Sequence, residues 1–332
     1  MREMSLEYGL TVIGMFLLTV IIEWKLIPVL RSHKAGQRIL EIGPRWHKSK
    51  EGTPTMGGIG FILAGLICTV VYLIIRAARG SAQLEIPLAT TLSFAAANGL
   101  IGFVDDYLKL VKKQNEGLRW YQKLILQFTV ASAYVAVMGY TGSVSSVVEF
   151  PLIGKSLDFG WLFWPLAVLV LVGVVNGGNL TDGIDGLAAS VSAVVGGFFA
   201  LWAFAWGKGS LGLLSAILLG GALGFLVFNF HPAKVFMGDT GSLFFGALVI
   251  GGAFMIRAYP VGLLLSGVFI FEMLSSFLQV LFFKLTKGKR LFKMAPFHHH
   301  LEKCGWNEYA IVALFSFFQL LCCVAAWLLL TT

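Results

Sequence analysis

Ten long apolar runs set what this chain can fold into. They lie near residues 5–29, 56–76, 87–105, 120–141, 161–179, 186–206, 211–229, 239–258, 261–285 and 307–330. A run of about twenty apolar residues is what a helix needs to cross the hydrocarbon core of a bilayer. Because backbone polar groups must be bonded internally in lipid, the sequence predicts an all-α polytopic membrane protein with about ten transmembrane helices.

The composition agrees with that class. Charged residues make up only 13% of the chain and hydrophobic residues 57%, and the mean hydropathy is +0.82. The first apolar run is longer than a signal peptide and has no small-residue cleavage site, so we interpret it as a retained span. No repeat of 20–50 residues is visible, and the spans need one bundle, so we expect a single domain over residues 1–332.

The basic residues predict the orientation in the membrane. The loops 30–55, 106–123, 230–238 and 284–306 hold 18 of the 25 lysines and arginines. Cytoplasmic loops carry such an excess. We therefore expect these loops in the cytoplasm and both termini on the outer, periplasmic or extracellular side. The net charge of +8 is then a topology signal and an attraction for anionic lipids or phosphates. No nucleic-acid partner is expected.

Aspartate and histidine gather on the same predicted face. All the histidines fall in predicted cytoplasmic segments, as do five of the six aspartates: Asp105, Asp106, Asp182, Asp185 and Asp239. Chance would not place both residue types on one side. We expect the chemistry on the cytoplasmic face.

The segment 176–187, NGGNLTDGIDGL, interrupts two apolar runs with polar side chains and four glycines. Asp182 and Asp185 are three residues apart and would share a face if the segment were helical. The pattern suggests a polar pocket at a membrane face. The alternative is an ordinary turn between two spans.

Two adjacent carboxylates end the third span in the segment FVDDYLKL. A carboxylate costs about 2.5–3.5 kcal/mol at mid-bilayer and less near the interface. Adjacent side chains on a helix diverge by about 100°, so Asp105 and Asp106 should differ in role: one a base or metal ligand, the other orienting a neighbour. The alternative is an interfacial pair balanced by nearby lysines. Lys123, at the mouth of the fourth span, could meet a phosphate.

Three further cytoplasmic segments carry candidate residues. In GTPTMGG, Thr53 offers a hydroxyl near Lys48, a plausible phosphate contact unless the loop is only a basic anchor. In the segment 229–241, Pro232 ends a helix and the next span begins near Asp239, where free N–H groups can hold phosphate; Asp239 could instead be a simple N-cap. Glu272 and Gln279 place one face of the ninth span towards the bundle. The three histidines after Pro296 could be a metal tract or a solvated patch.

Three Asp-bearing, glycine-rich turns on one face suggest a Mg²⁺ site that serves phosphates. Mg²⁺ takes one or two carboxylates, keeps several waters and binds phosphate oxygens. Lysine and histidine would neutralise diphosphate charge. The reaction class that fits is phosphoryl transfer from a nucleotide-sugar to a lipid acceptor.

Four segments also resemble a known family. FVDDYLKL (103–110), NLTDGIDGL (179–187), VFMGDTGSL (235–243) and APFHHHLE (295–302) are similar to the signature segments of the polyprenyl-phosphate N-acetylhexosamine-1-phosphate transferases. GTPTMGG and the triple histidine resemble the branch that uses a muramoyl-pentapeptide donor. The likeness runs from about residue 20 to the end. Phe244–Phe245 depart from the family, where small residues are usual, which bears on packing of that span.

The resemblance implies transfer of phospho-MurNAc-pentapeptide from UDP-MurNAc-pentapeptide to undecaprenyl phosphate, giving lipid I and UMP in peptidoglycan synthesis. It also implies Mg²⁺ dependence, a bacterial inner-membrane location and a homodimer. The roles it implies are these: Asp105 deprotonates or orients the lipid phosphate with Asp106 beside it; Asp239 binds Mg²⁺; Asn179, Asp182, Asp185, Asn229 and Phe236 line the uridine and diphosphate pocket; Lys48, Thr53 and Gln279 lie at its rim; His298, His299 and His300 contact the phosphate or the sugar-peptide part.

Two questions stay open at this point. The lipid phosphate could attack the β-phosphorus directly, or a carboxylate could first form a phospho-enzyme. Direct attack needs only positioning and charge neutralisation and is preferred.

The donor could instead be UDP-GlcNAc. An ion-coupled secondary transporter would also show intramembrane carboxylates, but they would lie at the midplane. A lipid-binding scaffold would not explain five one-sided aspartates.

Overall fold

The structure is a computed structural model that describes residues 2–32, 52–80, 85–112, 114 and 116–331. The helices of the first half are α1 (Arg2–Ser32), α2 (Gly58–Ala78), α3 (Ile86–Lys112), α4 (Trp120–Tyr140) and α5 (Phe163–Thr181). Those of the second half are α6 (Leu187–Trp206), α7 (Gly209–Asn229), α8 (Gly238–Met255), α9 (Tyr259–Leu265), α10 (Gly267–Leu285), α11 (Phe297–Lys303) and α12 (Glu308–Thr331).

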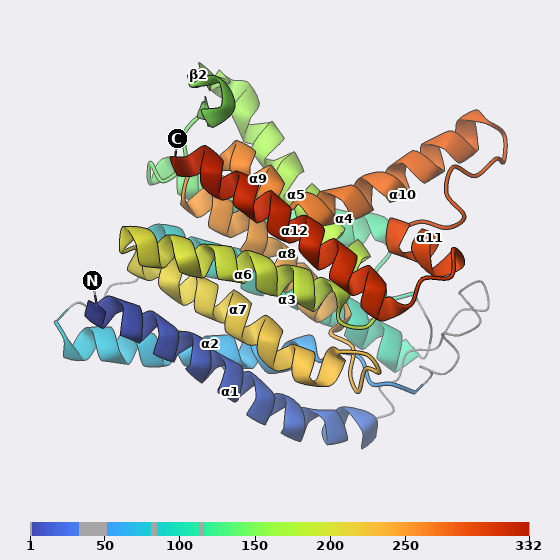
Figure 1. Cartoon of the computed structure of the whole chain (residues 1–332), viewed down its shortest axis with the longest axis horizontal. Helices are drawn as coiled ribbons and strands as arrows, with labels where there is room; N and C mark the ends of the chain where they lie inside the picture. The colour runs from blue at the N-terminus through green and yellow to red at the C-terminus, as the bar shows by residue number, and fades with distance from the viewer. Residues whose placement is uncertain (1, 33–51, 81–84, 113, 115, 332) are drawn as a thin grey trace.

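Ten helices in this described part of the chain are long and apolar enough to cross a membrane. This confirms the predicted polytopic helical class and the number of spans. The two termini lie at the same end of the bundle (Figure 1), as an even number of spans requires. That this end faces outwards stays a prediction.

A small hairpin interrupts the helices in the connection that precedes α5. Strand β1 (Val147–Phe150) pairs antiparallel with β2 (Lys155–Asp158), and short 3-10 turns at Pro151–Ile153 and Gly160–Leu162 flank β2. No strand is predicted in this loop from the sequence. The hairpin lies near the chain termini (Figure 1), so it is remote from the residues discussed below.

Helix α8 is the centre of the bundle. Every residue from Thr240 to Phe254 is buried, and α2, α3, α5, α6 and α7 all pack against the helix. Phe245 stacks on Phe61 of α2 with ring centroids 4.2 Å apart, and Phe244 lies against Gly99 of α3. Gly99 leaves room for Phe244, and Phe245 packs face to face on Phe61. The bundle accommodates both bulky residues in this way.

The ninth predicted span is wrong as a single helix over 261–285. The chain breaks at Ser266 into the short α9 and the long α10. Backbone groups freed in this way must find partners in a membrane. Gln319 of α12 supplies them: its Oε1 accepts from the Val268 N–H at 3.1 Å and its Nε2 donates to the Leu265 carbonyl at 3.0 Å.

Helices α3 and α8 approach closely where α8 begins. A Cβ atom on Gly102 would overlap the carbonyl group of Asp239, and one on Gly58 would overlap the backbone of Gly241. Since L-residues cannot occupy such space without moving the neighbouring backbone, these two glycines set the spacing of α2, α3 and α8 around the start of α8.

Gly102→Ala should therefore force α3 away from α8. We expect a loss of about 1–3 kcal/mol in stability, the usual cost of overpacking, and loss of activity. The control is Gly197→Ala on α6, where a Cβ meets no atom within 4 Å. Thermal unfolding in detergent measures both variants; equal midpoints for the two would show that the α3–α8 contact is not this close.

Candidate active site

The ends of α3, α4 and α5 meet the start of α8. The segment before α2 joins them: the Phe236 N–H donates to the Pro54 carbonyl at 2.8 Å, and the Gly57 N–H donates to the Phe236 carbonyl at 2.9 Å. The glycine-rich segment GTPTMGG therefore lies alongside the segment VFMGD as a short backbone pairing. Thr53 and Phe236, both half-buried, lie on or next to these two paired segments.

Asp106 caps α8 from another helix. Its Oδ1 accepts from the Asp239 N–H at 3.2 Å, and its Oδ2 accepts from the Thr240 N–H at 2.9 Å and the Thr240 hydroxyl at 2.7 Å. Carboxylates stabilise a helix N-terminus because its first N–H groups have no partner in the helix. Asp239 itself is the second residue of α8 and not its N-cap, so the alternative of a simple N-cap is wrong.

Asp239 is surrounded by cations and an amide. Its Oδ2 lies 2.8 Å from the Lys123 ammonium and 3.2 Å from that of Lys109. Its Oδ1 accepts from the side-chain amide of Asn179 at 2.8 Å, and that amide also donates to Ser242 at 2.8 Å. The Asn179 carbonyl oxygen in turn accepts from Lys123 at 3.2 Å. The orientation of the Asp239 carboxylate is thus fixed from three helices.

Asp105 has a different environment from Asp106. Its Oδ1 accepts from the Leu118 N–H at 2.7 Å, and its Oδ2 lies 2.6 Å from the Lys109 ammonium. A Cβ on Gly117 would collide with Asp105. Lys109 also lies 3.6 Å from the Asp106 Oδ1, so the two adjacent carboxylates share this lysine but differ in their backbone partners. Asp105 binds the loop at Leu118, and Asp106 binds the start of α8.

Asp105, Asp106 and Asp239 form a cluster that fits a divalent cation. Each can offer a carboxylate oxygen within 4.8 Å of the others. Hard oxygen donors of this kind suit Mg²⁺. Three carboxylates against two ammonium groups also leave negative charge at the cluster, which a cation would neutralise.

Residues 182–186 form a turn and not a helix, so Asp182 and Asp185 do not share a helical face. The Asp185 Oδ2 accepts from the Ala233 N–H at 3.0 Å and lies 2.9 Å from the His231 Nδ1. The Asp185 N–H donates to Glu308 of α12 at 3.0 Å. These contacts join the turn to the segment after α7 and to the start of α12.

Asp182 lies close to the other carboxylates. Burial, together with the charges of Asp239, Asp106 and Asp185, raises the pKa of Asp182 well above its usual range. Asn229 supports the same turn: it accepts from the Gly186 N–H at 3.0 Å and donates to the Val235 carbonyl at 2.9 Å.

The three histidines of α11 have three different surroundings. His298 is fully buried and lies 3.2 Å from a carboxylate oxygen of Glu272, with its Nε2 against Gly183 of the turn. His299 lies 2.6 Å from Glu302. His300 accepts from the Lys293 N–H at 3.1 Å. His298 is thus brought against the turn that carries Asp182.

Of the remaining predicted residues, Lys48 lies outside the described residues. The side chain of Gln279 bonds to the chain itself: its Oε1 accepts from the N–H groups of Leu291 and Phe292 at 3.1 and 2.8 Å. The predicted contact of Gln279 with the donor therefore stays a prediction, and the structure shows a second task for this side chain.

Sequence reasoning missed several residues of the site. Lys109 is one of the lysines near the Asp pair, and its spacing of four residues from Asp105 places both side chains on one helical face. The Thr240 hydroxyl donates to Asp106, and the Ser242 hydroxyl accepts from Asn179. Both hydroxyls belong to the segment GDTGS, so the sequence already contained them as candidates. Glu308 gave no signal, because only the fold brings the start of α12 to the turn.

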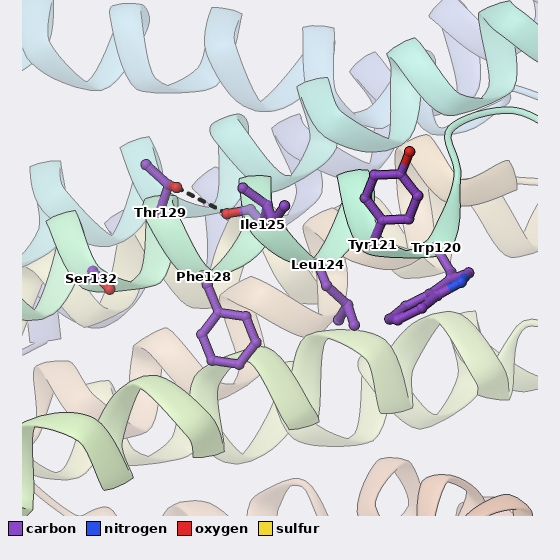
Figure 2. Close-up of a pocket in the computed structure, with 7 residues that line it drawn as sticks. All are labelled: Trp120, Tyr121, Leu124, Ile125, Phe128, Thr129 and Ser132. Carbon is purple, nitrogen blue, oxygen red and sulfur yellow. Dashed lines mark hydrogen bonds between the residues drawn. The ribbon is translucent and has the colours of Figure 1, made fainter.

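An apolar groove of about 640 Å³ runs along α4, next to Lys123 in sequence. Figure 2 shows the side chains that line it: Trp120, Tyr121, Leu124, Ile125, Phe128, Thr129 and Ser132. The Thr129 hydroxyl donates to the Ile125 carbonyl at 2.9 Å, so this polar group is satisfied within the helix. The groove is therefore suited to a hydrocarbon chain.

Asp106→Ala should unfold the start of α8. Removing a charged acceptor from buried N–H groups costs about 1–3 kcal/mol or more, so we expect a lower thermal midpoint as well as loss of activity. Glu116→Ala, in the exposed loop after α3, is the control and should unfold like the parent protein. An Asp106→Ala midpoint equal to that of this control would refute the capping role.

Comparison with known proteins identifies the family to which the chain is similar. The family profile described as glycosyl transferase family 4 matches residues 88–258. The phospho-N-acetylmuramoyl-pentapeptide-transferase of Halalkalibacterium halodurans is 44% identical over 306 residues, which cover 92% of each chain. The enzyme of that name from Bacillus subtilis is 43% identical over 305 residues, with the same coverage of each chain.

A relative of the same name from Caldicellulosiruptor bescii is 39% identical over 323 residues, or 97% of each chain. The likeness thus extends over nearly the whole length of the chain. The resemblance noted in the sequence is confirmed: the chain belongs to glycosyl transferase family 4 and, within it, to the phospho-N-acetylmuramoyl-pentapeptide transferases.

Proposed function

We propose that the protein transfers phospho-MurNAc-pentapeptide from UDP-MurNAc-pentapeptide to undecaprenyl phosphate, giving lipid I and UMP for peptidoglycan synthesis in a bacterial inner membrane. The observation that carries this proposal is the cluster of Asp105, Asp106 and Asp239 with Lys109 and Lys123 at the junction of α3, α4 and α8. The family membership supplies the donor and the acceptor.

Mg²⁺ is the cofactor that the carboxylate cluster suits. Asp239 and Asp105 would hold the ion, and when bound it would neutralise the charge on the phosphate oxygens. Asp106 is committed to the α8 backbone, so its contribution is to fix Asp239. Lys109 and Lys123 lie where their ammonium groups can leave Asp239 for phosphate oxygens without leaving the site.

The acceptor would enter from the membrane along α4. Trp120, Leu124 and Phe128 of the groove (Figure 2) offer an apolar track for a polyprenyl chain, and Lys123 on the same helix reaches Asp239. In this proposal the lipid phosphate binds beside Asp105, which would deprotonate or orient it. Direct attack on the β-phosphorus then needs positioning and charge neutralisation alone.

The donor would lie on the other side of the cluster. The turn 182–186, Asn229 and the segment 53–57 surround this side with hydrogen-bonding groups, and Phe236 offers a ring for the uracil base. We place this face in the cytoplasm, from the basic loops, and expect the protein to act as a homodimer. A transporter would need its carboxylates near the midplane, whereas this cluster lies where α8 begins.

The test is UMP release by the protein purified in detergent. We expect release with UDP-MurNAc-pentapeptide and undecaprenyl phosphate in Mg²⁺, and none in EDTA. UDP-GlcNAc serves as the second donor and should give no release. Release with UDP-GlcNAc alone would keep the chemistry and discard the donor assignment. Release of UMP from neither donor, beside an active control enzyme, would contradict the transferase function.

A further inference from the structure

The three histidines sit on a helix that cannot hold its own position. Helix α11 spans only Phe297–Lys303, which is far below the length at which an isolated helix is stable. It follows a connection from α10 that has no regular secondary structure in residues 289–296. The place of α11 must therefore be set by contacts with the rest of the protein.

Glu272 of α10 binds the start of α11. Its Oε2 accepts from the Phe297 N–H at 2.8 Å, and its Oε1 accepts from the His298 N–H at 3.2 Å. Ser275, one turn further along α10, accepts from the Phe297 N–H at 3.0 Å. The Glu272 side chain is completely buried, so these N–H groups compensate its carboxylate for the water it has lost.

Gln279 holds the preceding connection in the same manner. Besides accepting from the Leu291 and Phe292 N–H groups, it donates from Nε2 to the Phe292 carbonyl at 3.2 Å. Glu272 and Gln279 are seven residues apart, so they lie on one face of α10 two turns from each other. Two polar side chains on an otherwise apolar helix thus bind two separate stretches of backbone.

The result of this arrangement is the position of His298. Its Nε2 lies so close to Gly183 that a side chain at residue 183 would collide with it. The His298 Nδ1 lies 3.2 Å from a Glu272 carboxylate oxygen, but neither ring nitrogen makes a hydrogen bond of good geometry among the described residues. Packing and backbone bonds, and not hydrogen bonds of the ring, therefore hold the imidazole against the turn that carries Asp182.

We propose that Glu272 and Gln279 are positioning residues, which bind the backbone of residues 291–298 and so hold His298 against the donor-binding turn. The donor side of this inference rests on the proposed function. The binding of the backbone does not, since it concerns contacts within the chain. Glu272 acts through α11 and needs no contact with substrate.

Hydrogen–deuterium exchange of the full-length protein in detergent tests the two contacts separately. In Glu272→Ala the amides of residues 297–303 should exchange at least tenfold faster, while residues 290–293 change less than twofold. Gln279→Ala should give the opposite pattern. Glu272→Gln, which keeps the shape and one acceptor, should be intermediate. Leu274→Ala, an exposed position on α10, is the matched control and should leave both segments unchanged.

Two exchange results would overturn the proposal. Unchanged protection of residues 297–303 in both Glu272 variants would show that the carboxylate does not hold α11. Faster exchange spread evenly over α8 and the other helices would show a general loss of folding instead of a local one. If Glu272→Ala does not fold, Glu272→Gln decides the same question, because it retains the side-chain volume.

Steady-state kinetics then connect position with donor binding. In Glu272→Gln and Gln279→Ala we expect kcat/KM for the UDP-linked donor to fall about tenfold, with the KM for undecaprenyl phosphate within twofold of the parent value. Equal changes for both substrates would contradict the assignment of α11 to the donor side. If the parent protein itself releases no UMP, the proposed function fails, and the exchange pattern still decides the positioning roles.

Discussion

The contact between Asp106 and the first N–H groups of α8 is the interaction on which the rest of the site depends. It joins α3 to the central helix of the bundle at one point, and Gly102 allows the two backbones to come close enough for it. Asp239 is the second residue of α8, and its own N–H is one of the groups that Asp106 binds. The same contact therefore fixes where the Asp239 carboxylate lies. A buried carboxylate is expensive in a membrane protein, and here three backbone and hydroxyl donors compensate for it.

The remaining charges are arranged around this point. Lys109 lies one turn beyond Asp105, Lys123 enters from α4, and Asn179 enters from α5. Each binds Asp239 or its neighbours, so four helices contribute to one polar cluster at the edge of an apolar bundle. The cluster combines anionic oxygens for a metal with ammonium groups for phosphates, which is the combination that phosphoryl transfer requires. In the proposed function, the apolar groove along α4 is the track for the lipid acceptor.

The sequence predicted the spans because apolar length indicates them, and it singled out Asp105, Asp106, Asp182 and Asp239 as candidates because charge in apolar sequence is conspicuous. It did not predict that Asp106 caps a distant helix, since that depends on a contact between residues more than a hundred positions apart. The break at Ser266 was missed because Gln319, which compensates for it, is on another helix. The β-hairpin was missed because its strands are four residues each. The burial of His298 could not be read from a histidine run that suits solvent equally well.

The most direct test of the account is whether Asp239 binds the divalent cation. Electron paramagnetic resonance of a Mn²⁺ titration, with Mn²⁺ standing in for Mg²⁺, measures the bound ion in the purified protein. Asp239→Asn keeps the shape of the side chain and an oxygen for Asn179. The account predicts one saturable site in the parent protein and its loss in Asp239→Asn, with the helical circular dichroism unchanged and with the site retained in Asp158→Asn on the remote hairpin. Undiminished Mn²⁺ binding by a folded Asp239→Asn variant would contradict the account.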